Sequence, residues 1–370
     1  MKVKNLTVTN HILTVNWMDD SYSEFPTIWL RDNCPSGLHP DTNERLTDLL
    51  EIDEKPVLIS AELIGKNINL EYEDGYKSLM PISLIDKHRP GRPVSDPGLV
   101  SFQLWKKDLT EINIIRHKAS PIISDDLALK NWMDDTARIG LTIIDHLDYH
   151  TEAGEEIAKR IGFLRVTNFG STFEVLNKPD PNNLAYTSVR LPLHTDLPNQ
   201  EVPPGYQFLH CLANDAIGGE SLFADGFAMA EDLRAEDPKA FDLLSEVSIP
   251  FRFHDHTADI RIHRPVITLC SKGEVIEIRY NAHLAGIFDM PVDVMPDYYQ
   301  AYRSYMNKTR DSKYHLKIKL KAGEMVVFDN RRILHGRESF DPSTGFRHLH
   351  GCYVDRGEFV SRLRLLNSSF

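Results

Sequence analysis

The sequence predicts a mainly β protein with flanking helices, in which a barrel or jelly-roll core follows a small β-rich N-terminal domain. Three observations predict this fold class. Strand-like segments follow one another instead of alternating with helices, residues 1–90 alternate apolar and polar positions, and a stretch rich in proline and glycine separates the two parts. A doubly wound parallel sheet would instead place a helix after nearly every strand.

The N-terminal domain is expected over residues 1–90, a linker over 91–105 and the larger domain over 106–370. Two hairpins are predicted in the first domain. LTVTNHILTVNW alternates around a polar Thr-Asn-His step, and VLISAELIGKNINLEY repeats the pattern around a Gly-Lys turn. The segment DKHRPGRPVSDPG carries prolines and glycines among charges, which makes it the best linker candidate.

The larger domain is expected to mix short strands with a few helices. A helix is predicted with Ser124 as its N-cap and Gly140 at its end, and another pair of helices is broken at Pro238. Two more helical patterns occupy TEAGEEIAKRIG and MPDYYQAYRSYMNKTR. The strand-like pieces are GYQFLHCL, PVITLC, EVIEIRYN, HLKIKL and EMVVFDN.

The overall charge and the cysteines limit the class of function. A formal net charge of -12 argues against a non-specific nucleic-acid binder, which needs a basic face, and it is compatible with a cationic small substrate. The four cysteines lie far apart, so we expect no disulfide framework and a reducing compartment. No long apolar run or secretory apolar segment is visible, so we expect a cytoplasmic protein without a membrane span.

A His-x-Asp step can supply two metal ligands, because residues i and i+2 of a strand face the same side. The step occurs three times, beginning at His39, His146 and His194. A His-x-Asp step alone is a weak signal of a metal site. A third metal ligand from a distant part of the sequence distinguishes the three steps. His335 follows the strand-like MVVFDN in an apolar setting. Two histidines and a carboxylate would leave three positions on iron(II) for cosubstrate and oxygen, so we expect iron on His194, Asp196 and His335.

Two further residues lie at informative distances from these ligands. Arg347 follows His335 by twelve residues, and Ser221 follows Asp196 by 25 residues. The planar fork of arginine suits a carboxylate, so Arg347 is expected to hold the far carboxylate of 2-oxoglutarate, with a hydrogen bond from Ser221. This four-part combination resembles the pattern of the taurine dioxygenase superfamily of iron(II) and 2-oxoglutarate oxygenases. Only the step at His194 fits all four parts.

The resemblance extends to one family within that superfamily. The chain is similar to the γ-butyrobetaine dioxygenase and trimethyllysine dioxygenase family in FPTIWLRDNC, GFLRVTNFG, NNLAYTSVRLPLHTD, PPGYQFLHC, GGESLFADGF, VVFDNRRILHGRESF and RHLHGCYVDR. These stretches cover nearly the whole chain. The resemblance implies a double-stranded β-helix (jelly-roll) catalytic domain, a small β-rich N-terminal domain and a homodimer. It also implies iron(II), 2-oxoglutarate and O2 as the reacting partners.

The resemblance implies a substrate site as well. An aromatic box for a trimethylammonium group matches Phe169, Phe173, Tyr186 and Tyr353, and two amides near the acidic end of the substrate match Asn183 and Asn281. A quaternary ammonium cannot donate hydrogen bonds, so aromatic faces are its natural partners, each contributing about 0.5–2 kcal/mol when desolvated.

We therefore expect hydroxylation of a small trimethylammonium substrate, with γ-butyrobetaine to carnitine as the first candidate. The residues after Asn281 (Ala282, His283 and Leu284) differ from the butyrobetaine pattern. Trimethyllysine and 2-(trimethylammonio)ethylphosphonate therefore stay open as substrates. A phosphonate would favour an added basic residue near its acidic group, and Arg190 is the candidate.

Members of this family often carry zinc in the N-terminal domain on three cysteines and a histidine. Here Cys34 and His39 are the remaining donors, and Gly75 stands where the family histidine is expected. A tetrahedral site needs four donors, so we expect no conventional zinc site.

Two other classes of function stay open. One is a non-catalytic ligand-binding protein that keeps the fold. The other is a metal-dependent hydrolase that uses His254, Asp255, His256 and His263.

Overall fold

The computed structural model describes residues 2–176 and 187–369. It divides into two compact units, Met1–Asp96 and Pro97–Phe370, each with its own core. Over the described part of the chain, no helix combines the length and the apolar character that crossing a membrane requires.

The N-terminal unit contains two three-stranded antiparallel sheets and two short helices. Its elements are β1 (Val3–Thr9), β2 (Ile12–Trp17), β3 (Tyr22–Pro26), α1 (Thr27–Asp32), β4 (Leu58–Ile64), β5 (Asn67–Tyr72), β6 (Lys77–Pro81) and α2 (Ile82–Lys87). Both predicted hairpins are confirmed, because β1 pairs with β2 and β4 pairs with β5. Alternate residues of β2, such as Leu13 and Val15, are fully buried in the core of this unit.

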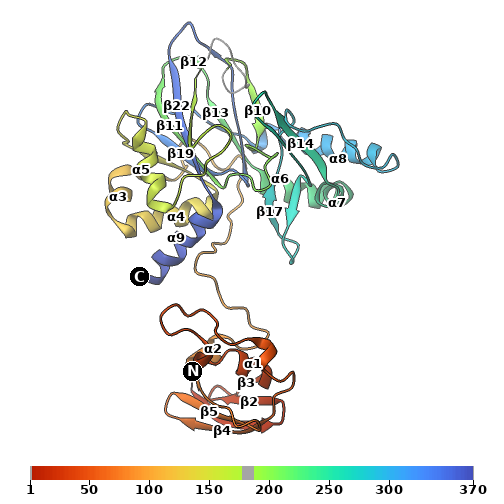
Figure 1. Ribbon diagram of the computed structural model, residues 1–370. Coiled ribbons are helices and arrows are strands. Elements are labelled where there is room, and N and C mark those ends of the chain that lie inside the picture. Colours follow the sequence, from red (N-terminus) through yellow and green to blue (C-terminus); the bar gives the residue numbers. More distant parts are fainter. Residues whose placement is uncertain (1, 177–186, 370) are drawn as a thin grey trace. The chain divides into compact units, whose positions relative to one another are not determined.

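The larger unit is built on two facing sheets, as the predicted jelly roll requires (Figure 1). The six-stranded sheet contains β7 (Arg116–Lys118), β8 (Leu141–Asp145), β19 (Met325–Asp329), β11 (Tyr206–Asn214), β22 (Arg347–Val354) and β9 (Thr172–Val175), in this spatial order. The four-stranded sheet contains β10 (Leu191–His194), β20 (Ile333–Arg337), β13 (Ser221–Asp225) and β18 (Leu316–Ile318). Leu209, Phe223 and Phe328 are buried in one cluster with residues of both sheets.

Three short strand pairs complete the β structure. They are β12 (Ile217–Gly218) with β21 (Phe340–Asp341), β14 (Ile249–His254) with β15 (Asp259–Arg264), and β16 (Ile267–Leu269) with β17 (Val275–Ile278). The strands β11, β16, β17, β18 and β19 occupy the segments that the sequence predicted as strands.

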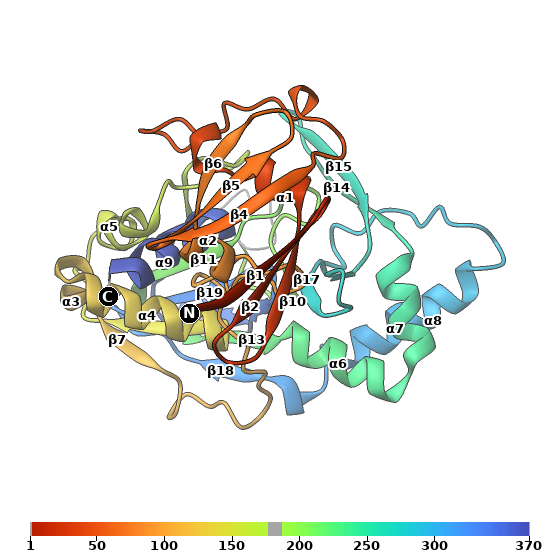
Figure 2. The same cartoon turned by 90° about the horizontal axis from the view of Figure 1, so that it is seen from below.

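Helices cover the β core in two groups, which lie on opposite sides in both views (Figures 1 and 2). One group is α3 (Ala119–Ser124), α4 (Asp126–Ile139), α5 (Glu152–Ile161) and α9 (Arg356–Ser369), and the other is α6 (Gly226–Glu236), α7 (Pro238–Glu246) and α8 (Met295–Lys308). The break at Pro238 and the end of α4 at Gly140, which has a φ of 84°, are confirmed. The predicted N-cap of α4 is wrong by one residue. Asp125 accepts a hydrogen bond from the Ala128 amide, while Ser124 ends α3.

Candidate active site

A cavity of about 560 Å³ lies in the larger unit, lined by residues of both sheets, by β14 and by the segment after Asn281. The predicted residues Phe169, Phe173, His194, Asp196, Ser221, Asn281, His335, Arg347 and Tyr353 all line it. The other two predicted residues, Asn183 and Tyr186, lie outside the described residues. The structure therefore brings these nine residues to one place.

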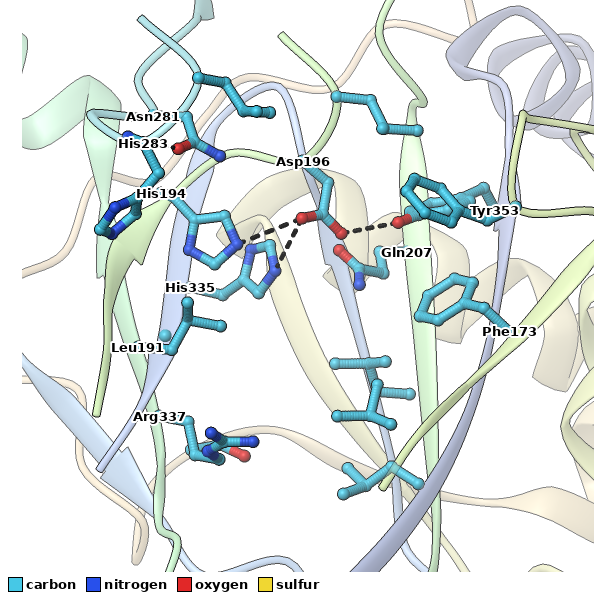
Figure 3. A pocket seen from close by; sticks show the side chains of 18 of the residues that line it. Phe173, Leu191, His194, Asp196, Gln207, Asn281, His283, His335, Arg337 and Tyr353 are labelled. Atoms are coloured by element: carbon cyan, nitrogen blue, oxygen red, sulfur yellow. Dashed lines mark hydrogen bonds and ion pairs between the residues drawn. The ribbon is translucent and has the colours of Figure 1, made fainter. Parts of the chain in front are cut away.

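The centre of the cavity holds three side chains with metal-binding atoms. His194 at the end of β10 is the direct cross-strand partner of His335 on β20, and Asp196 lies just beyond β10. Asp196 Oδ1 is 3.2 Å from His194 Nε2 and 3.5 Å from His335 Nε2 (Figure 3). Within residues 2–176 and 187–369, this is the one group of three or more His, Cys, Asp or Glu side chains compact enough for a metal ion. Its chemistry fits iron(II), which two imidazoles and one carboxylate can bind.

Neighbouring groups hold these three side chains in place. His194 Nδ1 lies 2.8 Å from the Pro192 carbonyl, which orients the ring and leaves Nε2 for a metal. The fully buried amide of Asn330 accepts a hydrogen bond from the Asp196 backbone N–H (2.7 Å) and donates one to the Asp196 carbonyl (3.1 Å). The sequence analysis missed this role of Asn330, although the residue ends the strand-like EMVVFDN.

The ionisation of the group suits metal binding. Burial raises the pKa of Asp196, but His335 and His194 lower it more, so this pKa lies well below the ordinary value of a carboxyl group. Burial lowers the pKa of His335, against the opposite effect of Asp196. A charged carboxylate beside a neutral imidazole is the ligand form that a metal ion requires.

A buried cationic region lies at another part of the cavity. Arg347, at the start of β22, donates through Nε to the Gly219 carbonyl at 3.3 Å. Ser221 on β13 pairs in register with Arg337 on β20. Burial, followed by the effect of Arg337, lowers the pKa of Arg347 to about 10, so its guanidinium stays charged at neutral pH. A charged, water-poor guanidinium that shares the cavity with the Ser221 hydroxyl can bind a carboxylate of the cosubstrate.

Aromatic rings line the side of the cavity across from His194 (Figure 3). Phe173 and Tyr353 are stacked with their centroids 5.0 Å apart, and Phe169 meets Phe253 edge-on at 5.4 Å. Phe253 was not predicted, because it lies on β14, far in sequence from the matched positions. The Phe173 ring packs on Gly351, where an added Cβ would lie 2.4 Å from Phe173 Cζ.

Asn281 lines the cavity near the proposed metal site, whereas Arg190 does not line it. Asn281 Oδ1 accepts a hydrogen bond from the His283 amide at 3.0 Å, which holds the Asn281 side chain beside His194 (Figure 3). Arg190 does not line the cavity, and its Nε lies 3.3 Å from a Glu338 carboxylate oxygen. Arg252, which the sequence analysis did not single out, does line the cavity.

The rival metal-binding residues do not gather in one place. His263 Nε2 pairs with Asp289 at 2.8 Å, and Asp255 accepts hydrogen bonds from Thr257 in a turn. In the N-terminal unit, Cys34 Sγ lies 3.0 Å from Ser36 Oγ. His39 Nδ1 accepts from two backbone amides of its own turn, so these donors do not fit a four-ligand zinc site.

Comparisons with known proteins agree with this geometry. The model of the taurine catabolism dioxygenase TauD, TfdA family matches residues 118–353, and the model described as gamma-butyrobetaine hydroxylase-like, N-terminal, matches residues 4–80. A relative named gamma-butyrobetaine dioxygenase from Pseudomonas sp. (strain AK-1) is 41% identical, over 96% of this chain and 93% of its own. The Homo sapiens protein of the same name is 30% identical, over 96% and 94%.

Two more distant proteins complete the comparison. Mitochondrial trimethyllysine dioxygenase from Gallus gallus is 28% identical, over 94% of this chain and 84% of its own. The crystal structure of a taurine dioxygenase from Burkholderia xenovorans superposes with a TM-score of 0.51 at 13% identity, over 69% of this chain and 90% of its own, and supports the fold alone. The chain belongs to the taurine catabolism dioxygenase TauD, TfdA family, and it is an iron(II)- and 2-oxoglutarate-dependent dioxygenase.

Proposed function

We propose that the enzyme hydroxylates a small trimethylammonium acid, with γ-butyrobetaine to carnitine as the first candidate reaction. The observation that carries the proposal is that one cavity is lined by the His194, Asp196 and His335 group, by the buried Arg347 and by a stacked aromatic pair. The relatives named gamma-butyrobetaine dioxygenase support the choice of the first substrate.

His194, Asp196 and His335 would hold iron(II). Iron(II) with 2-oxoglutarate and O2 supplies the hydroxylation: one oxygen atom enters a substrate C–H bond, the other stays in succinate, and carbon dioxide leaves. The protein contributes the orientation of the bound molecules and the exclusion of water. Asn330 contributes by fixing both backbone polar groups of Asp196, and the Tyr353 hydroxyl restrains its carboxylate through a hydrogen bond.

Arg347 and Ser221 would bind the far carboxylate of 2-oxoglutarate. The Arg347 side chain is buried, and its hydrogen bond to the Gly219 carbonyl uses Nε, so its two terminal nitrogens can form the paired contacts that a carboxylate prefers.

The trimethylammonium group would lie against the rings of Phe169, Phe173 and Tyr353, with Phe253 as an additional ring. Figure 3 places Phe173 and Tyr353 across the cavity from Asn281, so the two ends of a zwitterionic substrate would point in opposite directions. Tyr186 and Asn183 stay predictions from the family resemblance.

The test is succinate formation by the iron-loaded enzyme with 2-oxoglutarate and O2. The panel holds γ-butyrobetaine, trimethyllysine and 3,3-dimethylbutyl analogues in which carbon replaces the quaternary nitrogen. We expect stimulation by a quaternary amine and little by its uncharged analogue, because only the cation is attracted to the ring faces. Equal stimulation by both members of a pair would exclude the trimethylammonium substrate.

The same assay distinguishes the other classes of function. His194→Ala is expected to abolish succinate formation, because a metal ligand is lost. Iron binding without any consumption of 2-oxoglutarate would favour a non-catalytic binding protein, and activity that needs zinc but no oxygen would favour a hydrolase.

A further inference from the structure

Gln207 is a buried polar residue on the cavity wall whose amide oxygen lacks a partner among the described residues. It lies near the start of β11, is 2% exposed and lines the cavity. Its Oε1 atom has no hydrogen-bond partner within residues 2–176 and 187–369. A buried amide that is not satisfied costs folding free energy, so a polar ligand in the cavity is the natural group to complete it.

The strand pairing places Gln207 close to the proposed metal site. Gln207 lies opposite Tyr353 of β22 on one side and opposite Phe328 of β19 on the other. Opposite residues of antiparallel strands direct their side chains to the same face of the sheet. The Tyr353 hydroxyl donates to Asp196, and the centroids of the Phe328 and His335 rings are 4.9 Å apart. Gln207 therefore lies between contacts of two proposed metal ligands, and Figure 3 shows its side chain directed toward Asp196.

Packing alone does not account for a glutamine at this position. Three residues that flank it in the wall, Leu209, Phe328 and Leu349, are buried in one hydrophobic cluster. A leucine in place of Gln207 would pack on these neighbours and leave no polar atom unsatisfied. A residue that gives up stability in the wall of an active site is better explained by a role in function.

The ligand that suits this amide is the end of the cosubstrate that binds iron. The other amide on the wall, Asn281, is engaged, because its Oδ1 accepts from the His283 amide at 3.0 Å and its Nδ2 donates to the Thr195 carbonyl at 3.4 Å. A 2-oxo acid that chelates a metal keeps one carboxylate oxygen free to accept a hydrogen bond. A half turn of the Gln207 amide exchanges its oxygen and nitrogen, so an N–H can point at this charged oxygen.

We infer that Gln207 donates an amide N–H to the metal-side carboxylate of 2-oxoglutarate and so positions this end of the cosubstrate. The cosubstrate is then held at both ends, by Gln207 beside the iron ligands and by Arg347 at the far carboxylate. Leu209 follows Gln207 by two residues on β11, and Leu349 follows Arg347 by two residues on β22. Both leucines line the cavity and suit the methylene groups of the cosubstrate. The role does not depend on which substrate is hydroxylated.

Anaerobic titration distinguishes the two ends of the cosubstrate. The protein at saturating iron(II) is titrated with 2-oxoglutarate and with pyruvate, which keeps the 2-oxo acid but lacks the far carboxylate. The visible absorption band that iron(II) gains on chelation by a 2-oxo acid reports binding. Gln207→Leu should weaken the binding of both acids by the same factor, about tenfold. Arg347→Gln should weaken the binding of 2-oxoglutarate at least as much, but that of pyruvate by less than about twofold.

The stability of the ligand-free protein distinguishes a binding role from a structural one. Because Gln207 Oε1 has no partner among the described residues, Gln207→Leu should unfold at the same or a higher temperature than the unmutated protein without iron and cosubstrate. Gln207→Met, which keeps the length of the side chain, repeats both measurements if Gln207→Leu does not fold.

Gln200→Leu is the matched control. Gln200 is also buried, but its Oε1 accepts a hydrogen bond from Arg165, and it is not among the residues that line the cavity. This variant should lower the melting temperature, because a satisfied buried amide is lost, and it should leave the affinity for both 2-oxo acids within about twofold.

The outcomes decide the role of Gln207. Unchanged affinity of Gln207→Leu for both 2-oxo acids would overturn the inference. A loss confined to 2-oxoglutarate would overturn it as well, because that pattern assigns Gln207 to the far carboxylate. A lower melting temperature with unchanged affinity would give Gln207 a structural role instead. None of these titrations contains a trimethylammonium compound, so their result is independent of the proposed function.

Discussion

The hydroxyl of Tyr353 donates a hydrogen bond of 2.6 Å to Oδ2 of Asp196, the oxygen that faces away from His194 and His335. The same Tyr353 ring stacks on Phe173 in the proposed substrate site. One residue therefore contacts both the carboxylate of the proposed iron site and the aromatic wall.

Tyr353→Phe should separate these two contacts. The ring stays, so the KM for the trimethylammonium substrate should change by less than about threefold, while the loss of the hydrogen bond to Asp196 should weaken iron(II) binding by about tenfold. Anaerobic iron titration and steady-state kinetics at saturating iron measure the two effects. Unchanged iron affinity would mean that the hydroxyl does not orient Asp196.

Gly336→Ala should destroy the metal site. A Cβ at this position would lie 2.5 Å from the backbone oxygen of Leu191, so β10 would have to move away from β20, and His194 away from His335. We expect iron binding to be lost and the melting temperature to fall. Gly357→Ala is the control, because an added Cβ there meets no atom within 4 Å. Normal iron affinity in Gly336→Ala would contradict the close strand pairing.

Gly351→Ala should damage the substrate site and spare the metal site. The added methyl group would displace the Phe173 ring, since the two would lie only 2.4 Å apart. Loss of one aromatic face should raise the KM for a trimethylammonium substrate by about threefold to thirtyfold. Iron affinity should stay within about twofold, and an unchanged KM would remove Phe173 from the substrate site.

Acid should destabilise the larger unit through His210. This residue is 1% exposed, and neither ring nitrogen has a hydrogen-bond partner among the described residues. Burial, followed by His350, His150 and His348, lowers the pKa of His210 to about 4. The nearby carboxylates are Glu152, Glu155 and Glu174, which act on His350.

Between pH 6.5 and 4 the unfolded state binds a proton at His210 that the folded state does not, so stability must fall as the pH falls through this window. The contribution amounts to at most about 3 kcal/mol. Urea unfolding at pH 7 and at pH 5 measures the free energy of unfolding. The difference between the two pH values should be smaller for His210→Gln than for the unmutated protein. The exposed His11→Gln serves as the control, and an unchanged pH dependence in His210→Gln would contradict the role of His210.

Local patterns explain why much of the fold and the centre of the site could be predicted. The hairpins, the break at Pro238 and the end of α4 at Gly140 depend on neighbours in sequence. His194 and Asp196 lie two residues apart at the end of one strand, and His335 follows another strand directly. The aromatic residues of the site were predicted from the family resemblance. The homodimer that the same resemblance implies stays a prediction.

The features that the sequence analysis did not predict depend on contacts between distant segments of the chain. Phe253 and Arg252 reach the cavity only because β14 lies along the segment after Asn281, and no local pattern encodes that pairing. The sequence offered Arg190 as the basic residue near the acidic group of a phosphonate substrate, but its side chain pairs with Glu338. The N-cap of α4 is Asp125 and not the predicted Ser124, because Ser124 belongs to the preceding helix α3.

The β14–β15 hairpin forms a two-stranded sheet of its own, apart from the two sheets that carry the iron-binding side chains. Arg252 and Phe253 of this hairpin line the cavity, so mutations in the hairpin can change the cavity wall while the two sheets that hold the iron-binding side chains stay intact. Selection could then produce new substrate preferences in small steps, each in a protein that still activates oxygen.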